Sequence, residues 1–101
     1  MSRNDPTCWT FITNHGHVLL CLADDPDMTV REVAIKVGIT ERAVIRIIGE
    51  LEAGGVIERE REGRRNHYTI DTKAPLRHEL EEHRTVGDLI SMVRKRSRPS
   101  E

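Results

Sequence analysis

Residues 29–55 read TVREVAIKVGITERAVIRIIGELEAGG, and this stretch decides the fold. Thr29 and Glu32 have the spacing of a capping box, in which a hydroxyl and a carboxylate accept hydrogen bonds from N–H groups at the start of a helix. Gly38 is the residue type that most often ends a helix, because glycine adopts left-handed backbone angles without strain. The pattern predicts a short helix whose buried face consists of Val33, Ala34 and Val37.

The second half of this stretch predicts another helix, capped by Thr40 and ended by Gly54 and Gly55. Ala34 is small where the two helices cross, and Ile39 can fill the gap between them. Two helices joined by a short turn that contains glycine form a helix-turn-helix arrangement. Apolar residues at spacing i, i+3, i+4 and i+7 place one face of the second helix in the core: Val44, Ile47, Ile48 and Leu51.

The flanking segments extend this arrangement. An earlier helix is predicted by apolar residues at helical spacing over 18–22, and it ends before Pro26, since the residue preceding a proline avoids helical geometry. Near the end of residues 56–70, apolar side chains alternate with polar ones, and Gly63 indicates a tight turn. Together these features predict a two-stranded hairpin. The expected fold is therefore mainly α with a small β-hairpin (α+β), over residues 9–70.

A further helical segment is expected over 76–95, after a joint at 71–75. Pro75 can either open a helix through Leu80 or end a loop, and both alternatives stay open. Thr85 resembles a helix cap, while Gly87 weakens the helix by about 1 kcal/mol relative to alanine. We expect residues 1–8 and 96–101 to be flexible tails. The apolar stripe of the C-terminal helix is a candidate dimerisation surface: Val86, Leu89, Ile90 and Val93.

Charge and composition narrow the possible functions. The 101 residues contain 16 Lys and Arg against 17 Asp and Glu, a net charge of −1. This balance excludes a globally basic nucleic-acid binder but allows a locally basic surface. No apolar run approaches the ~18 residues of a membrane span, and the N-terminus lacks the apolar region of a secretory signal. Two cysteines without CxxC spacing favour an intracellular, cytoplasmic protein with reduced thiols.

The helix-turn-helix followed by a hairpin points to DNA. The second helix of such a pair presents its polar side to the major groove, where arginine can bond bidentately to guanine, and a hairpin with arginines at its tip can follow the phosphate backbone. Arg42 and Arg46 are the best candidates for contacts to bases, and Ala43 or Ile45 for a thymine methyl group. The full set of DNA-binding candidates is Thr29, Thr40, Arg42, Ala43, Ile45, Arg46, Arg61, Arg64, Arg65 and Asn66.

Residues 29–70 resemble the winged helix-turn-helix of MarR-type transcription regulators, with ArsR-type regulators as near relatives. The residues that carry the resemblance are VREVA at 30–34, VGITERAV at 37–44, LEAGGVI at 51–57 and REGRRNHY at 61–68. WTFITNH at 9–15, RRNHYT at 64–69 and TVGDL at 85–89 are similar to a group of short bacterial regulators of this class.

The resemblance implies a DNA-binding transcription regulator, which we expect to be a repressor. The apolar stripe of the C-terminal helix predicts a homodimer, and the two-fold symmetry of a dimer predicts a palindromic operator with half-sites ~34–36 Å apart. MarR-type proteins usually add helices at both ends that form the dimer and an effector pocket. Because this sequence has little before Trp9 and about one helix after the hairpin, we do not expect a small-molecule effector.

Other readings remain open beside DNA binding. A winged helix can serve as a protein-interaction module, favoured by Glu41, Glu60 and Glu62 on surfaces that would approach phosphate. A metal or redox sensor would use Cys8, Cys21 or the helical pairs His78–Glu82 and Glu79–His83. No nucleophile motif or phosphate-binding loop supports an enzyme, and we expect no cofactor and no metal. Trp9 and Phe11 are expected in the core or a dimer contact, and His15 and His17 in local hydrogen bonds.

Overall fold

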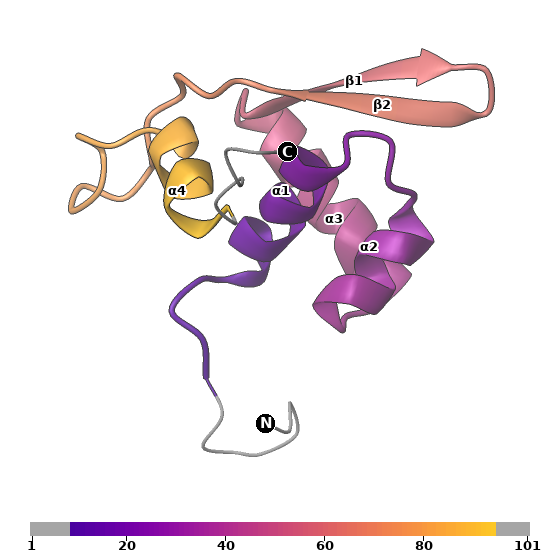
Figure 1. The fold of residues 1–101 in the computed structure, drawn as a ribbon, viewed down its shortest axis with the longest axis horizontal. Helices are drawn as coiled ribbons and strands as arrows, with labels where there is room; N and C mark the ends of the chain where they lie inside the picture. The colour runs from indigo at the N-terminus through magenta and orange to yellow at the C-terminus, as the bar shows by residue number, and fades with distance from the viewer. Residues whose placement is uncertain (1–8, 95–101) are drawn as a thin grey trace, which may run out of the picture.

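The computed structural model describes residues 9–94 as three packed helices, a long hairpin and a fourth helix beside them (Figure 1). The helices are α1 (Asn14–Asp24), α2 (Val30–Val37), α3 (Glu41–Ala53) and α4 (Val86–Val93). The hairpin consists of β1 (Ile57–Glu62) and β2 (Arg65–Ile70). The α+β winged helix-turn-helix expected from the sequence is confirmed, and the element order follows the prediction as far as residue 70.

Threonine caps begin all four helices. The predicted box at α2 is present, with Thr29 N donating to Glu32 Oε1 at 2.9 Å and Glu32 N donating to Thr29 Oγ1 at 3.1 Å. A second box joins Thr85 and Asp88 at α4. Gly38 ends α2 with φ 86°, a left-handed conformation that favours glycine, so the turn into α3 occurs where the sequence predicts it.

One apolar core joins the three N-terminal helices to the base of the hairpin. Its most deeply buried side chains come from α1, α2 and α3, and the predicted buried face of α3 is confirmed. Cys21 is in this core, as expected. Tyr68, 4% exposed, extends the core into β2, and Tyr68 N donates to Pro26 O at 3.0 Å, which ties the hairpin to the turn before α2.

The C-terminal segment differs from the expectation. Helix α4 covers only Val86–Val93, and residues 71–85 form a loop closed by a bridge between Pro75 and Thr85. Between 77 and 84 the loop has a single apolar residue, Leu80, which is 77% exposed, so a helix there would have no face to bury. The proposed helical pairs His78–Glu82 and Glu79–His83 therefore share no helix face.

The loop returns α4 onto the protein's own core. Val86 is 3% exposed and Ile90 is 6% exposed, so neither is available to a partner, which corrects their assignment to a dimer surface. Leu89 also packs against the core, whereas Val93 is 42% exposed. Gly87 is explained by close packing: a Cβ there would lie 2.8 Å from the carbonyl oxygen of Thr72.

Some expectations concern residues outside the described range, namely the flexible tails at 1–8 and 96–101 and the role of Cys8. At the start of that range, Trp9 and Phe11 are not in the core. They are 69% and 94% exposed, with their rings 4.9 Å apart in an edge-to-face arrangement. Within residues 9–94, no helix is both long enough and apolar enough to span a membrane.

Candidate nucleic-acid interface

The outer face of α3 presents the side chains expected to read DNA. Arg42, Ile45, Arg46 and Gly49 follow the i, i+3, i+4, i+7 pattern and are all exposed, with Ile45 61% exposed. Ala43 is half-buried, so it lies at the edge of this face rather than at its centre. The face is therefore a stripe of two arginines around one exposed isoleucine.

The start of α3 has groups that can bind a phosphate. Thr40 Oγ1 accepts a hydrogen bond from Ala43 N at 3.0 Å, which leaves its hydroxyl hydrogen able to donate. The positive end of the helix dipole lies at the same place. Thr29 caps α2 in the same way, because its Oγ1 accepts a hydrogen bond from Glu32 N. The Thr29 side chain is also exposed.

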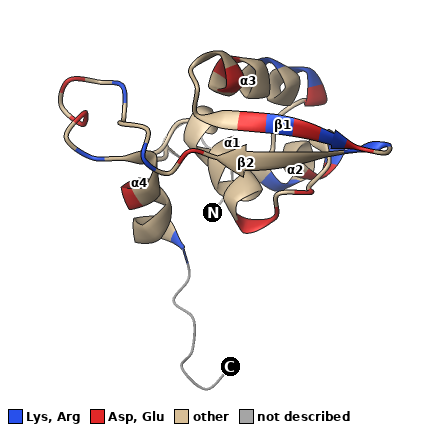
Figure 2. Ribbon diagram, turned by 90° about the horizontal axis from the view of Figure 1, so that it is seen from above, with Lys and Arg blue, Asp and Glu red and all other residues tan. Residues whose placement is uncertain are grey.

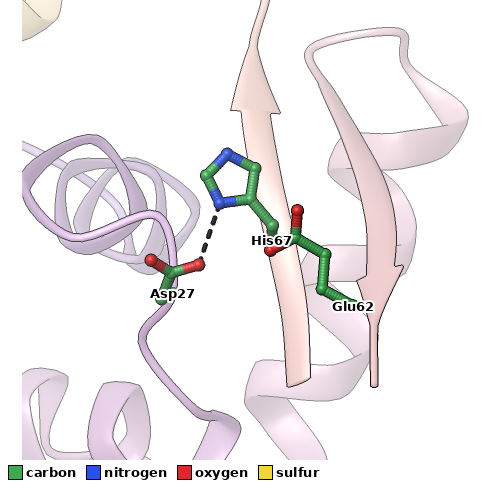
Figure 3. A group of neighbouring side chains, drawn as sticks. All are labelled: Asp27, Glu62 and His67. Carbon is green, nitrogen blue, oxygen red and sulfur yellow. Dashed lines mark hydrogen bonds and ion pairs between the residues drawn. The ribbon is translucent and has the colours of Figure 1, made fainter. Parts of the chain in front are cut away.

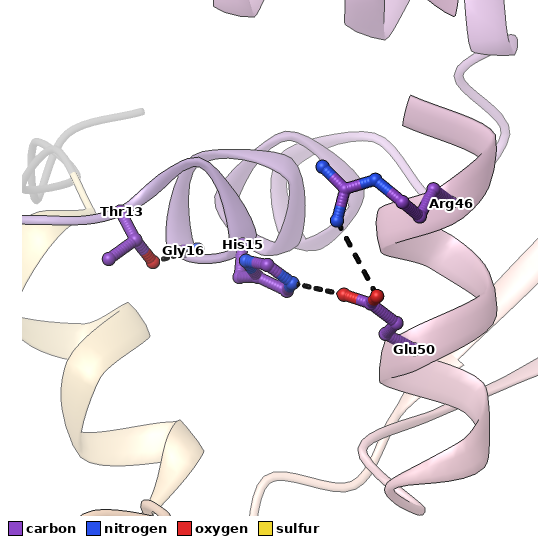
Figure 4. A network of polar contacts seen from close by, with 5 residues as sticks. All are labelled: Thr13, His15, Gly16, Arg46 and Glu50. Atoms are coloured by element: carbon purple, nitrogen blue, oxygen red, sulfur yellow. Dashed lines mark hydrogen bonds and ion pairs between the residues drawn. The ribbon is translucent and has the colours of Figure 1, made fainter. Parts of the chain in front are cut away.

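Arg46 belongs to a network that sequence reasoning missed (Figure 4). Arg46 Nη1 lies 3.5 Å from Glu50 Oε2, and Glu50 Oε1 lies 2.6 Å from His15 Nε2 on α1. The hydrogen bond from His15 and the charge of Arg46 hold the pKa of the Glu50 carboxyl below its usual range. The expectation of a local bond for His15 is wrong, since its partner is 35 residues away. His17 does bond locally, with Asn14.

Because Arg46 is four residues before Glu50, the ion pair was visible in the sequence as an i,i+4 spacing. The contact from His15 was not, since it depends on how α1 packs against α3. The network restrains Arg46, which must share or leave Glu50 to reach a base.

The hairpin divides its charges between two faces. Antiparallel pairing sets Arg61 opposite Asn66 and Glu62 opposite Arg65, and directly paired residues point to the same side. Arg61 and Asn66 therefore share one face near the tip. Arg65 lies on the other face, with acidic neighbours: Glu58, Glu60 and Glu62.

Arg64 is in the turn at the tip, beside Gly63, whose φ is 62°. Arg61 Nε donates to Gly63 O at 3.2 Å, so this arginine folds back to stabilise the turn. Figure 2 shows the basic residues at the tip and the alternation of acidic and basic residues along β1. The four wing candidates thus lie near one tip, but Arg65 projects from a different face than Arg61.

A polar cluster lies between the hairpin and the turn before α2 (Figure 3). His67 Nδ1 is 2.8 Å from Asp27 Oδ1, and one ligand-type atom from each of Asp27, Glu62 and His67 lies within 4.8 Å of the others. The hydrogen bond to Asp27, with the charges of Asp27, Glu62 and Glu60, raises the pKa of the His67 imidazole above its usual value. These side chain types can hold a divalent ion, but the arrangement already forms an ion pair at the surface. Asp27 and His67 are 40 residues apart, and no local sequence pattern marks them as partners.

The remaining sensor candidates receive no support from the described residues. Burial raises the pKa of the Cys21 thiol, which keeps it protonated and unreactive at neutral pH.

An open groove of about 920 Å³ lies between α1, β2 and α4, with Leu22, Tyr68, Ile90 and Arg94 among its lining residues. Three of these lining residues, Leu22, Tyr68 and Ile90, belong to the apolar core.

Comparison with known proteins agrees with this geometry. Residues 13–58 match a family described as winged helix-turn-helix DNA-binding. A comparison with curated proteins found no match.

Two transcription regulators are among the solved structures similar to this chain. One is MepR, a transcription regulator of the Staphylococcus aureus multidrug efflux pump MepA. The match to MepR has 24% identity and a TM-score of 0.52, and it covers 59% of this chain and 47% of that one. The other is the PcaV transcriptional regulator from Streptomyces coelicolor, solved with its natural ligand, at 23% identity and a TM-score of 0.55. That match covers 80% of this chain and 56% of PcaV. The chain spans about half the length of these relatives.

The helix-turn-helix followed by the hairpin is the winged helix-turn-helix fold, and the match over residues 13–58 is to a DNA-binding family of that fold. The similarity to MepR and PcaV shows a shared fold, and the winged helix-turn-helix inferred from the sequence is confirmed at that level.

Proposed function

We propose that the chain is a cytoplasmic, homodimeric transcription repressor that binds a palindromic DNA operator. Helix α3 enters the major groove, and the hairpin lies along the backbone or the minor groove. The observation that carries this proposal is the exposed stripe of α3, where Arg42 and Arg46 flank Ile45 beside a threonine-capped helix start. Arginines read guanine in this position, and Ile45 can contact a thymine methyl group.

The wing supplies contacts that do not depend on base sequence. Arg64 at the turn, with Arg61 and Asn66 on one face, would hold phosphates or reach into the minor groove. Arg65 would contact the backbone from the other face, where the glutamates limit how closely DNA can approach.

Binding at several salt concentrations tests the wing. The double variant Arg64→Ala, Arg65→Ala should weaken operator and unrelated DNA alike, and should lower the salt slope of log affinity by about 1 to 2. Arg77→Ala, Arg84→Ala removes the same charge from the 71–85 loop and serves as the matched control. An unchanged affinity and slope in the wing variant would show that the hairpin does not contact DNA.

The proposed dimer surface keeps Val93 from the predicted stripe but not the buried Val86 and Ile90. Exposed apolar side chains lie at both ends of the described chain, Trp9 and Phe11 at one and Met92 and Val93 at the other, and Met92 is 73% exposed. Such side chains fit a contact between two copies. Light scattering should give a dimer at micromolar concentration. It should give a monomer for Phe11→Ser, Met92→Ser but not for Ile35→Ser, a control on α2 with a 72% exposed side chain.

The competing function is a protein-interaction module, favoured by the acidic face of β1. A mobility-shift assay on DNA upstream of the protein's own gene separates the two. Sequence-preferring binding supports the regulator, and its absence at low salt supports the interaction module.

A further inference from the structure

Two neighbouring contacts fasten the hairpin to the turn before α2. Tyr68 N donates to Pro26 O at 3.0 Å, and His67 Nδ1 lies 2.8 Å from Asp27 Oδ1, across 40 residues of sequence. Beyond these contacts toward the tip, both strands are exposed apart from the half-buried Asn66. Figure 1 shows the tip of the hairpin extending past the turn between α1 and α2. The direction of the projecting part is therefore set near residues 67 and 68.

The charges around His67 are almost all acidic. Asp27 faces it from the turn, Glu60 pairs with it directly across the hairpin, and Glu62 approaches diagonally from β1. The nearest basic group on β2 is Arg65, which also acts on Glu32 at the start of α2. A protonated His67 is thus the cation that joins carboxylates of the turn to carboxylates of the wing.

We propose that Asp27 and His67 are positioning residues, whose ion pair holds the wing against the turn before α2 so that its basic tip meets DNA in register with α3. This inference rests on the proposed function, because it assigns the wing a DNA contact. Neither residue needs to touch DNA. When His67 is neutral, the three carboxylates around it lose their shared cation and repel one another, which loosens the hairpin at its base.

The sign of the pH dependence follows from the protonation state. The pKa of His67 is raised above its usual value of 6.5, so the ion pair is complete below that pH and is lost as the pH rises through the raised pKa. DNA affinity should therefore fall between slightly acidic and slightly alkaline pH. The contact is exposed, so we expect a loss of about threefold to fivefold rather than a complete one.

The first experiment measures operator affinity by fluorescence anisotropy from about pH 6 to pH 8.5 at constant ionic strength. The wild type should weaken as the pH rises. His67→Arg, with a permanent charge, should bind tightly at every pH, and His67→Gln should bind weakly at every pH. The control His17→Gln should keep the wild-type profile. If both His67 variants showed the same dependence of operator affinity on pH as the wild type, the proposal would be overturned.

Asp27→Asn separates positioning from direct attraction between His67 and phosphate. Removing a negative charge near DNA should tighten binding if electrostatic attraction alone matters, whereas loss of the positioning contact should weaken it and flatten its pH profile. Asp24→Asn, which removes an exposed carboxylate at the end of α1, is the matched control. Tighter binding by Asp27→Asn would exclude a positioning role.

Two measurements without DNA keep this test separate from the proposed function. The hydrogen-exchange protection factor of the Tyr68 amide should fall as the pH rises in the wild type and stay low in His67→Gln, even if the chain binds no DNA.

Isothermal titration with Zn²⁺ tests the alternative that the cluster of Asp27, Glu62 and His67 binds a divalent metal ion. Stoichiometric binding at neutral pH that His67→Gln abolishes would make the cluster a metal site and overturn the proposal, while no such binding supports the ion pair.

Discussion

Helices α3 and α4 carry the same apolar spacing and use it differently. In α3 the residues at i, i+3, i+4 and i+7 are at most 9% exposed. In α4 the equivalent positions begin with Val86 and Ile90 in the core and end with Val93, 42% exposed. Spacing shows which face of a helix is apolar but not what covers that face. Which surface packs against that face depends on the loop that leads into the helix. The 71–85 loop turns α4 back onto the core of its own chain.

The largest effect should come from removing a core side chain from each helix. We expect Ile47→Ala on α3 to lower the free energy of unfolding by about 4 kcal/mol and Ile90→Ala on α4 by about 3 kcal/mol, because each leaves a cavity. Val93→Ala should change it by less than about 0.5 kcal/mol. Urea denaturation measures all three. A similar small effect at Ile90 and Val93 would mean that α4 is not part of the core in solution.

The outward residues of the two helices should separate DNA binding from folding. Arg42→Ala, Arg46→Ala should cost about 2 kcal/mol of operator affinity, roughly 30-fold, and should reduce discrimination against unrelated DNA. Ser91→Ala on α4 should leave DNA affinity unchanged. Mobility shifts with operator and scrambled duplexes measure both. Preserved discrimination in the double arginine variant would place base reading outside α3.

The glycines of the two helices should respond to alanine with opposite signs. Nothing lies within 4 Å of a Cβ at Gly49, so Gly49→Ala should stabilise α3 by about 0.5–1 kcal/mol. A Cβ at Gly87 meets Thr72 O at 2.8 Å, so Gly87→Ala should destabilise the protein by about 1 kcal/mol despite its better helix propensity. Thermal unfolding followed by circular dichroism shows the direction of each change, and stabilisation at Gly87 would contradict the close packing against Thr72.

The smallest difference lies in how acid affects the caps. The hydrogen bond from the Thr85 backbone lowers the pKa of Asp88 from its ordinary 3.8. The Asp88 carboxylate therefore stabilises α4 fully above pH 3.8, and this stabilisation is lost as the pH falls through the lowered pKa. The cap of α3 is Thr40, which does not titrate. Asp88→Asn should therefore reduce the acid sensitivity of α4 signals in NMR spectra and leave those of α3 unchanged.

The sequence predicted the parts of the candidate interface that depend on local pattern. Thr40, Arg42 and Arg46 lie on the exposed side of α3 because the apolar stripe on its other side was readable at helical spacing. The hairpin and its tip followed from alternation and from Gly63. The contacts of His15 with Glu50 and of His67 with Asp27 were not predictable, since each joins residues that are far apart in the chain and carries no local signal.

The sequence by itself determined the helix starts, the glycine turn and the apolar face of each helix, because caps and periodicity act within a few residues. Only the tertiary structure decided that Val86 and Ile90 are core rather than interface and that residues 76–85 form a loop. It also decided which face of the wing each arginine occupies. These outcomes depend on which surfaces meet when distant segments pack together, and hydrophobic burial is not directional enough for one segment's pattern to specify its partner.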